Sequence, residues 1–244
     1  MAESALAALV TGAGSGIGRA VAAELAGIGY RVALVGRDAG KLEATASELG
    51  DAAGPPLVAP CDVADREAVG AMAARVLAEF GSIDVLVCNA GTNTRERGLD
   101  VLAPAEWDRL IATNLTGAYN LVQALLPSMR ARGSGLVVQI ASVAGVRASV
   151  LGGAAYSASK FGQAALGLCL AREVGPAGIR SSVIYPGEVN TPILDGRPVP
   201  VGAERRAAIL QPADVARAVR FLVELDPRAH VPELVIKPTV DDFA

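Results

Sequence analysis

Residues 5–18 read ALAALVTGAGSGIG, and this stretch indicates the fold. Its first six residues are apolar without polar alternation, as expected for a parallel strand that is covered on both faces. After the glycines, Ile17, Val21, Leu25 and Ile28 fall on one face of a helix. The stretch therefore predicts a strand, a glycine turn and a helix in direct succession.

The turn has the spacing Gly12-x-x-x-Gly16-x-Gly18. Glycines at such a turn let the main chain approach a pyrophosphate closely, and the following helix directs its free amides and positive dipole end toward it. The related pattern Gly-x-Gly-x-x-Gly is not met, because Ile17 occupies its last position. The alternative is an ordinary glycine-rich loop between a strand and a helix.

Strands and helices are expected to alternate along the rest of the chain. Helical patterns separate the further apolar runs, which predict strands at Val32–Val35, Leu57–Pro60, Ile83–Cys88, Leu136–Ala141, Ile179–Tyr185 and Leu234–Ile236. This alternation predicts an α/β protein in which residues 1–244 form a single domain. The expected fold is a doubly wound parallel sheet of about seven strands with helices on both faces.

One predicted helix is unusual because it contains an asparagine. It starts at Pro104 and carries Trp107 through Leu125 on one face, with Asn114 in its interior. Asparagine is a poor helix former, so Asn114 requires either a hydrogen-bonding reason or a solvent-facing position.

Candidate site residues stand at the carboxyl ends of most of the predicted strands. They are Thr11 to Gly18, Arg37, Asp62, Asn89, Ser142 and Pro186. The carboxyl ends of parallel strands lie at one edge of a sheet, where open α/β sheets bind their ligands. These residues are therefore expected to form one site.

The end of the second strand bears on the choice of nucleotide. In βαβ units that bind nucleotides, an acid at this position favours a free 2′-hydroxyl and an arginine accommodates a 2′-phosphate. Gly36 followed by Arg37 favours NADP(H). Asp38 keeps NAD(H) as the alternative, although an aspartate directly before a helix is more often its N-cap.

Tyr156 and Lys160 are the candidate chemical groups. Residues four apart lie on one face of a helix, so both side chains can point into the same cleft. A nearby positive charge lowers the pKa of a phenol, which would let Tyr156 exchange a proton with an alcohol or a ketone at neutral pH. The alternative is that Tyr156 packs beneath the helix and Lys160 is a surface charge.

Composition narrows the class of protein. The chain has 244 residues, 52% of them hydrophobic, and a formal charge of −3, so the basic surface typical of nucleic-acid binding is not expected. The uncharged run Leu110 to Met129 is broken by polar residues, which indicates a buried helix and no membrane span. Met1 to Ser4 show no secretory pattern. The three cysteines are widely spaced, which suits neither disulfides nor a metal site. We therefore expect a reducing, cytoplasmic location.

Together these motifs resemble the short-chain dehydrogenase/reductase family over nearly the whole chain. They are Thr-Gly-x-x-x-Gly-Ile-Gly at 11–18, Asn-Ala-Gly at 89–91, Ser142, Tyr-x-x-x-Lys at 156–160 and Pro-Gly at 186–187. The resemblance implies a Rossmann-like fold and a nicotinamide-dependent oxidoreductase. It implies that Tyr156 is the general acid/base, that Lys160 lowers its pKa and bonds the nicotinamide ribose, and that Ser142 holds the substrate oxygen. Asn114 would hold a water that links Lys160 to solvent.

The resemblance also implies the cofactor contacts. The turn residues Gly12, Ser15, Gly16, Ile17 and Gly18 would hold the diphosphate and ribose, and Arg37 would favour NADP(H). The remaining contacts would come from Asp62 and Val63 at the adenine, from Asn89, Ala90 and Gly91 at the ribose, and from Pro186, Gly187, Val189 and Thr191 at the carboxamide.

Several features depart from the family pattern or lie outside it. Ser15 stands where many NADP-using members have a second basic residue. The interval from Ser142 to Tyr156 is one residue longer than the commonest family spacing, so the loop Arg147 to Gly153 is expected to carry an insertion that shapes the substrate pocket. The carboxyl end, Val231 to Pro238, lacks the usual glycine-rich ending and is similar to some hydroxy-acid and serine dehydrogenases. Residues 193–210 are expected to cover the pocket, and His230 is expected to be structural.

The function expected from these features is reversible hydride transfer between a nicotinamide and a secondary alcohol or ketone. Two alternatives are an NADP(H)-binding sensor with little turnover and a lyase or epimerase that uses the nicotinamide transiently. Glu188 and Arg147 either border the substrate or lie on the surface. We expect a homodimer or homotetramer that uses the helices after strands four and five, with Trp107 either in that contact or buried against the sheet.

Overall fold

The computed structural model describes residues 6–49 and 54–241. Seven parallel strands form one sheet in the order β3-β2-β1-β4-β5-β6-β7. The strands are β1 (Ala7–Thr11), β2 (Arg31–Gly36), β3 (Leu57–Pro60), β4 (Val85–Cys88), β5 (Gly135–Ile140), β6 (Ile179–Pro186) and β7 (Glu233–Ile236). This is the predicted doubly wound sheet, and its strand order reverses between β1 and β4, where such sheets bind ligands.

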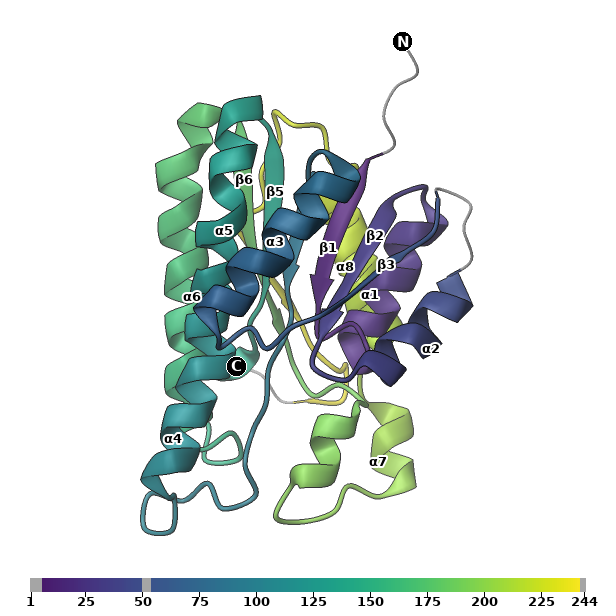
Figure 1. Ribbon diagram of the computed structural model, residues 1–244. Coiled ribbons are helices and arrows are strands. Elements are labelled where there is room, and N and C mark those ends of the chain that lie inside the picture. Colours follow the sequence, from purple (N-terminus) through teal and green to yellow (C-terminus); the bar gives the residue numbers. More distant parts are fainter. Residues whose placement is uncertain (1–5, 50–53, 242–244) are drawn as a thin grey trace.

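Helices cover both faces of the sheet (Figure 1). They are α1 (Gly16–Gly27), α2 (Ala39–Leu49), α3 (Arg66–Phe80), α4 (Pro104–Ile111), α5 (Gly117–Arg132), α6 (Ala154–Val174), α7 (Ala203–Ala208) and α8 (Pro212–Glu224). One apolar core packs α3, α5 and α6 against the sheet, and a second packs α1, α2 and α8 against the opposite face.

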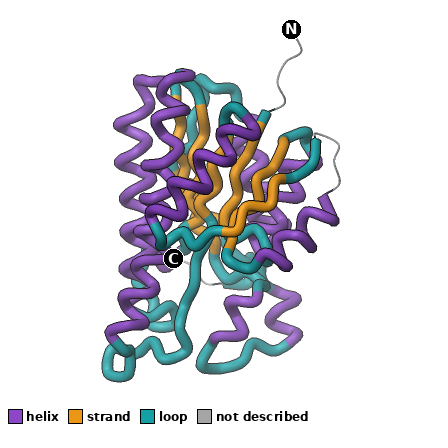
Figure 2. Tube along the Cα trace, in the orientation of Figure 1, coloured by secondary structure: helices purple, strands orange, loops and turns teal. Residues whose placement is uncertain are grey.

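The loops that follow the strands gather at one end of the sheet. Figure 2 shows the strands side by side between the helices, with long loop segments beyond the strands' lower ends. α4 and α7 project from this end in Figure 1, and the segment from η4 (Pro192–Gly196) to α7 follows β6. The sheet therefore places the predicted site at a single edge.

The predicted long helix from Pro104 is interrupted. α4 and α5 are separated by one π-helical turn, η1 (Ala112–Thr116), which contains the buried Asn114. Single π turns inside helices occur frequently at functional sites, and here the side chain of Asn114 bonds neighbouring segments. Strand ends differ from the predictions by one or two residues, and Ala5, where the first strand was expected to begin, lies outside the described residues.

Within residues 6–49 and 54–241, no helix combines the length and apolar character that crossing a membrane requires.

Candidate active site

The turn between β1 and α1 has a backbone conformation that depends on its glycines. Gly12 and Gly16 have φ angles of +66° and +52°, a conformation that side-chain-bearing residues rarely adopt. A Cβ on Gly18 would lie 2.3 Å from the carbonyl oxygen of Gly12. Ser15 precedes α1 without capping it through its side chain, so first-turn amides of α1 are left for a ligand.

Two further predicted segments lie against this turn. The Thr11 hydroxyl accepts hydrogen bonds from the main-chain N–H groups of Asn89 and Ala90, each at 3.0 Å. Asn89 Nδ2 donates to Thr11 O at 2.8 Å, and a Cβ on Gly16 would lie 3.1 Å from the Thr191 methyl group. The turn, residues 89–91 and the chain after β6 are therefore adjacent, as predicted.

Arg37 and Asp38 follow β2, where the sequence left open whether Asp38 contacts the cofactor ribose or caps α2. The Asp38 carboxylate accepts from Lys41 N at 3.1 Å at the start of α2 and forms an ion pair with Lys41. It therefore has the N-cap role that competed with ribose binding. Arg37 is exposed, and no described residue pairs with its side chain.

Other predicted cofactor contacts have structural partners. Asp62 accepts from Ala64 N at 3.0 Å after β3, and the buried Val63 packs beneath α5. Gly187 N donates to Ile236 O at 2.7 Å, and Val189 forms an isolated bridge with Leu210. These contacts place the segments at the carboxyl edge of the sheet.

Ser142 and Tyr156 form the centre of the site. Ser142 follows β5, and its Oγ accepts from Ala144 N at 3.2 Å. Tyr156 lies in the first turn of α6 and is partly buried. Burial raises the pKa of Tyr156 above its ordinary value of 10.0, while hydrogen bonding with Ser142 and the charges of Arg97 and Arg197 lower it.

Lys160 lies one turn further along α6 and is 3% exposed. Its Nζ donates to Ile140 O at 2.8 Å and to Gln163 Oε1 at 2.7 Å, and it lies 5.8 Å from the centre of the Tyr156 ring. Burial lowers the pKa of Lys160 to about 7.

The sequence predicted a lowered pKa for Tyr156, and the structure gives the opposite direction. The pKa of Tyr156 is raised, because burial of the phenol dominates, and the positive charges that oppose this effect belong to Arg97 and Arg197. Lys160 itself directs its ammonium group toward Ile140 and Gln163. The two side chains nevertheless share one face of α6, as expected.

Asn114 completes the group from the π turn. Asn114 is fully buried, accepts a hydrogen bond from Thr92 N at 2.8 Å and donates one to Ser159 Oγ at 3.0 Å. Of the two predicted explanations for an asparagine inside this helix, hydrogen bonding is therefore the one observed. A Cβ on Gly91 would lie 3.5 Å from Lys160 Nζ and 3.6 Å from Asn114 Oδ1. Gly91 therefore marks the place where Asn114 and Lys160 approach each other.

Arg97 is a site residue that the sequence reasoning missed. Its guanidinium donates to Thr94 O and Leu151 O at 2.8 Å and to Gly196 O at 2.9 Å, which joins three loops beside Tyr156. Burial and the charge of Arg197 lower the pKa of Arg97. Arg97 lies in an irregular loop, where no periodic pattern could have singled it out.

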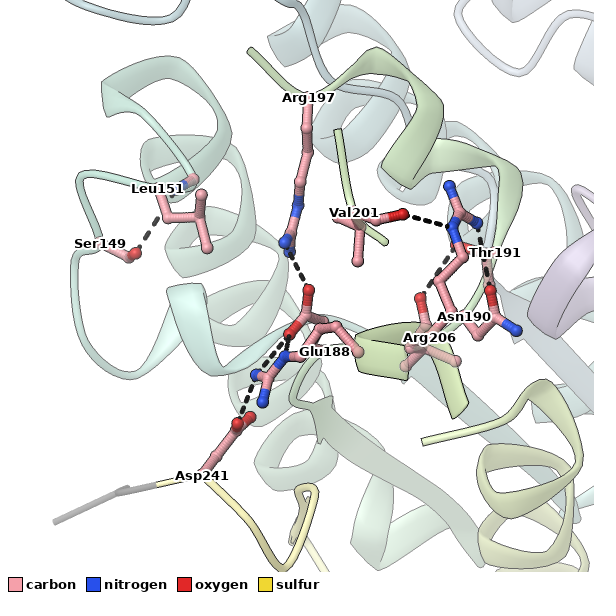
Figure 3. Close-up of polar contacts among 12 residues, drawn as sticks. Ser149, Leu151, Glu188, Asn190, Thr191, Arg197, Val201, Arg206 and Asp241 are labelled. Atoms are coloured by element: carbon pink, nitrogen blue, oxygen red, sulfur yellow. Dashed lines mark hydrogen bonds and ion pairs between the residues drawn. The ribbon is translucent and has the colours of Figure 1, made fainter. Parts of the chain in front are cut away.

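Glu188 links the chain after β6 to the segment 193–210. Its carboxylate, with a side chain 9% exposed, forms ion pairs with Arg197 and Arg205, and Arg205 also pairs with Asp241 (Figure 3). The Glu188 side chain is therefore largely buried and not on the surface, whereas Arg147 is exposed. That either residue borders the substrate stays a prediction. Arg206 adds a bond to Asn190 Oδ1 at 3.2 Å.

Other features lie away from these residues. A ring nitrogen of His230 is 2.8 Å from Ser181 O near the start of β6, which is a structural contact. A hollow of about 590 Å³ lies between α8 and the chain after β7, and none of the predicted site residues lines it. Within the described ranges, no three His, Cys, Asp or Glu side chains cluster as metal ligands.

The fold and the site define a Rossmann-type α/β protein with a Ser–Tyr–Lys centre. A family model described as short chain dehydrogenase matches residues 6–198. The chain therefore belongs to the short-chain dehydrogenase family, as its motifs predicted, and is an oxidoreductase.

Known proteins similar to this chain differ in substrate. The cis-4-hydroxycyclohexanecarboxylate dehydrogenase of Sinomonas cyclohexanicum is 38% identical over 88% of each chain. An alcohol dehydrogenase of the archaeon Thermococcus sibiricus, complexed with 5-hydroxy-NADP, has a TM-score of 0.88 and 31% identity and covers 98% of this chain and 99% of its own. The 3-ketoacyl-(acyl-carrier-protein) reductase of Brucella melitensis, complexed with NADH, has a TM-score of 0.84 and 30% identity, with 95% and 96% covered.

Proposed function

We propose that this protein catalyses reversible hydride transfer between a nicotinamide nucleotide, NADP(H) in preference to NAD(H), and a secondary alcohol or ketone. The observation that carries the proposal is the grouping of Ser142, Tyr156 and Lys160 beside the glycine turn at one edge of the sheet. A proton donor next to a dinucleotide cradle is what this reaction needs from the protein.

The chain's own groups suit such a cofactor. The open amides at the start of α1 and the close approach of Gly18 to Gly12 fit a diphosphate, and Arg37 is free to meet a 2′-phosphate. Asn89 to Gly91 and Thr191 lie where the nicotinamide half would follow. When bound, the nicotinamide would supply or accept the hydride.

Tyr156 would hold and move the proton. Its raised pKa keeps the phenol protonated at neutral pH, the form that donates to a carbonyl oxygen during reduction. Ser142 bonds the phenol and would also hold the substrate oxygen, and Lys160 with Asn114 would connect the phenol to the ribose and to solvent.

The decisive variant is Tyr156→Phe, which removes one oxygen. We expect turnover to fall by about 1,000-fold or more, because general acid catalysis contributes up to about 10,000-fold, while the cofactor Kd changes little. Steady-state rates and a fluorescence titration with NADPH measure the two effects. Tyr119→Phe, an exposed tyrosine on α5, is the matched control, and substantial turnover by Tyr156→Phe would contradict the assignment.

The direction of the Tyr156 shift predicts the pH dependence. A raised pKa keeps the phenol protonated to higher pH, so reduction is supported at neutral pH, whereas oxidation requires the phenolate and should gain as pH rises through that pKa. The ratio of oxidation to reduction rates, measured at saturating cofactor, should therefore increase with pH. A ratio independent of pH would exclude Tyr156 as the titrating group.

The same measurements test the alternatives. A nucleotide sensor would bind NADP(H) without turnover on any panel of alcohols and carbonyl compounds. A lyase or epimerase would turn over without a net change in nicotinamide absorbance. The panel should pair acids with their neutral esters, because Arg97 and Arg197 place positive charge near Tyr156.

We further propose a cytoplasmic homodimer or homotetramer in which residues 193–210 cover the substrate. Trp107 and Phe161 are 37% and 42% exposed on α4 and α6, two of the helices expected to form the contact. Light scattering of the purified protein gives the oligomeric state, and a monomer would overturn this part of the proposal.

A further inference from the structure

Four buried polar groups continue inward from the site. Lys160 and Gln163 lie one turn apart on α6, and Gln139 of β5 pairs in register with Cys88 of β4. Each of the four is at most 3% exposed. A buried amide costs free energy unless it is hydrogen-bonded, so two glutamines in this place call for a reason.

The bonds of Gln163 fix the orientation of its amide. Nε2 donates to Cys88 O and to Gln139 Oε1, both at 3.1 Å. Because a main-chain carbonyl can only accept, the nitrogen has to face Cys88, and Oε1 has to face Lys160. A flipped amide would set oxygen against oxygen on one side and N–H against an ammonium on the other.

This orientation gives Lys160 a fixed acceptor. An ammonium group has three N–H donors, and two of them go to Ile140 O at 2.8 Å and Gln163 Oε1 at 2.7 Å. The side toward Gly91 remains, where an added Cβ would lie 3.5 Å from Nζ. One donor is thus left on the side of Gly91.

We propose that Gln163 is a positioning residue for Lys160, whose ammonium group it holds at the end of β5 with one N–H directed toward the ligand. The consequence for turnover rests on the proposed function. The consequence for the titration of Lys160 does not, because it concerns the protein alone.

The uncharged surroundings of Lys160 Nζ make its hydrogen bond to Gln163 Oε1 important for the charge state of the ammonium group. The titratable groups that face it are Tyr156 from α6 and Cys88 from β4, whose thiol pKa is raised to about 12 by burial. Ile140, Asn114 and the turn Val143–Gly145 contribute no charge, and among the described residues no carboxylate lies within ion-pair distance of Nζ. With a pKa of about 7, Lys160 is near its midpoint at neutral pH, so each acceptor changes its charged fraction.

The sequence permits a direct test, because the chain has only three lysines, Lys41, Lys160 and Lys237. Protein labelled with carbon-13 at the lysine ε-carbon should give three signals, and Lys160→Arg assigns the one that titrates near neutral pH. Gln163→Met keeps the length and removes the carbonyl, so the midpoint should fall by about one pH unit. Gln163→Glu places a carboxylate at the ammonium and should raise it.

Gln139→Met is the matched control. Gln139 is as buried as Gln163 and belongs to the same group of amides, but it does not contact Lys160. Its replacement should move the midpoint by no more than about a third of the Gln163→Met shift. Equal shifts in both variants, or an unchanged midpoint in Gln163→Met, would overturn the proposal. If Gln163→Met does not fold, Gln163→Glu decides: a raised midpoint supports the proposal, and an unmoved one overturns it.

Kinetics then connect the titration to the reaction. Activity that needs the ammonium is lost as pH rises through the pKa of Lys160, so the falling limb of kcat/KM for carbonyl reduction should move to lower pH in Gln163→Met. A merely structural role would lower the rate equally at every pH. Absence of turnover in the unsubstituted protein would refute the proposed function and leave the titration result standing.

Discussion

The two sides of the site are built from different kinds of contact. The turn side, residues 12–18 with Asn89 to Gly91, is shaped by main chain and by glycines that admit no Cβ. The arginine side, formed by Arg97, Glu188, Arg197 and Arg205, is shaped by long charged side chains that join separate loops. The first kind of contact is encoded within a few residues, whereas the second depends on residues as far apart as Arg97 and Gly196.

Gly18→Ala should have the largest effect on the turn side. The new Cβ would lie 2.3 Å from Gly12 O and 2.6 Å from Asn89 Nδ2, so the turn would have to shift. Overpacking costs about 1–3 kcal/mol, and at about 1.4 kcal/mol per tenfold change the NADPH Kd should rise by about 10- to 100-fold. A fluorescence titration measures it.

Gly27→Ala provides the control in the same helix. No atom lies within 4 Å of the place where its Cβ would be, so the cofactor Kd should stay unchanged. If Gly18→Ala bound NADPH as tightly as Gly27→Ala, the turn side would not depend on close main-chain approach.

This contrast explains which parts the sequence could predict. The strand Leu57–Pro60 was predicted with its observed bounds, and the turn at Gly12 to Gly18 lies where expected, because apolar runs and glycine spacing are local signals. Asn114 was predicted to need hydrogen bonds, since it conflicts with helix propensity. The π turn that carries it has no such local signal.

The failures have a common physical origin. Arg97 was missed because two of its three partners, Leu151 and Gly196, lie in distant segments, and no spacing within its own loop reports them. The pKa of Tyr156 was predicted in the wrong direction because burial of the phenol depends on the packed site. Gln163 had a signal, three residues after Lys160 on the same helix, but its role depends on Cys88 and Gln139 of neighbouring strands.

Arg97→Met should separate the two sides by function. It removes three bonds to Thr94, Leu151 and Gly196, and we expect kcat/KM for the substrate to fall by about tenfold while the NADPH Kd stays within about twofold. Arg95→Met, an exposed arginine of the same loop, is the control. If Arg97→Met weakened cofactor and substrate equally, the two sides would act as one unit.

Arg37→Ala should have the smallest effect, because it removes a contact from the exposed rim of the turn side without disturbing the main chain. An exposed ion pair contributes at most about 1 kcal/mol, so the NADPH Kd should rise by about fivefold and the NADH Kd should not change. Asp38→Asn is the informative partner variant, since Asp38 caps α2 and should not contact the ribose. Titrations with both nucleotides at low and high salt measure the difference, which salt should reduce. Equal weakening of both nucleotides by Arg37→Ala would remove the basis for NADP(H) preference, and tighter binding of NADPH by Asp38→Asn would place that carboxylate at the ribose after all.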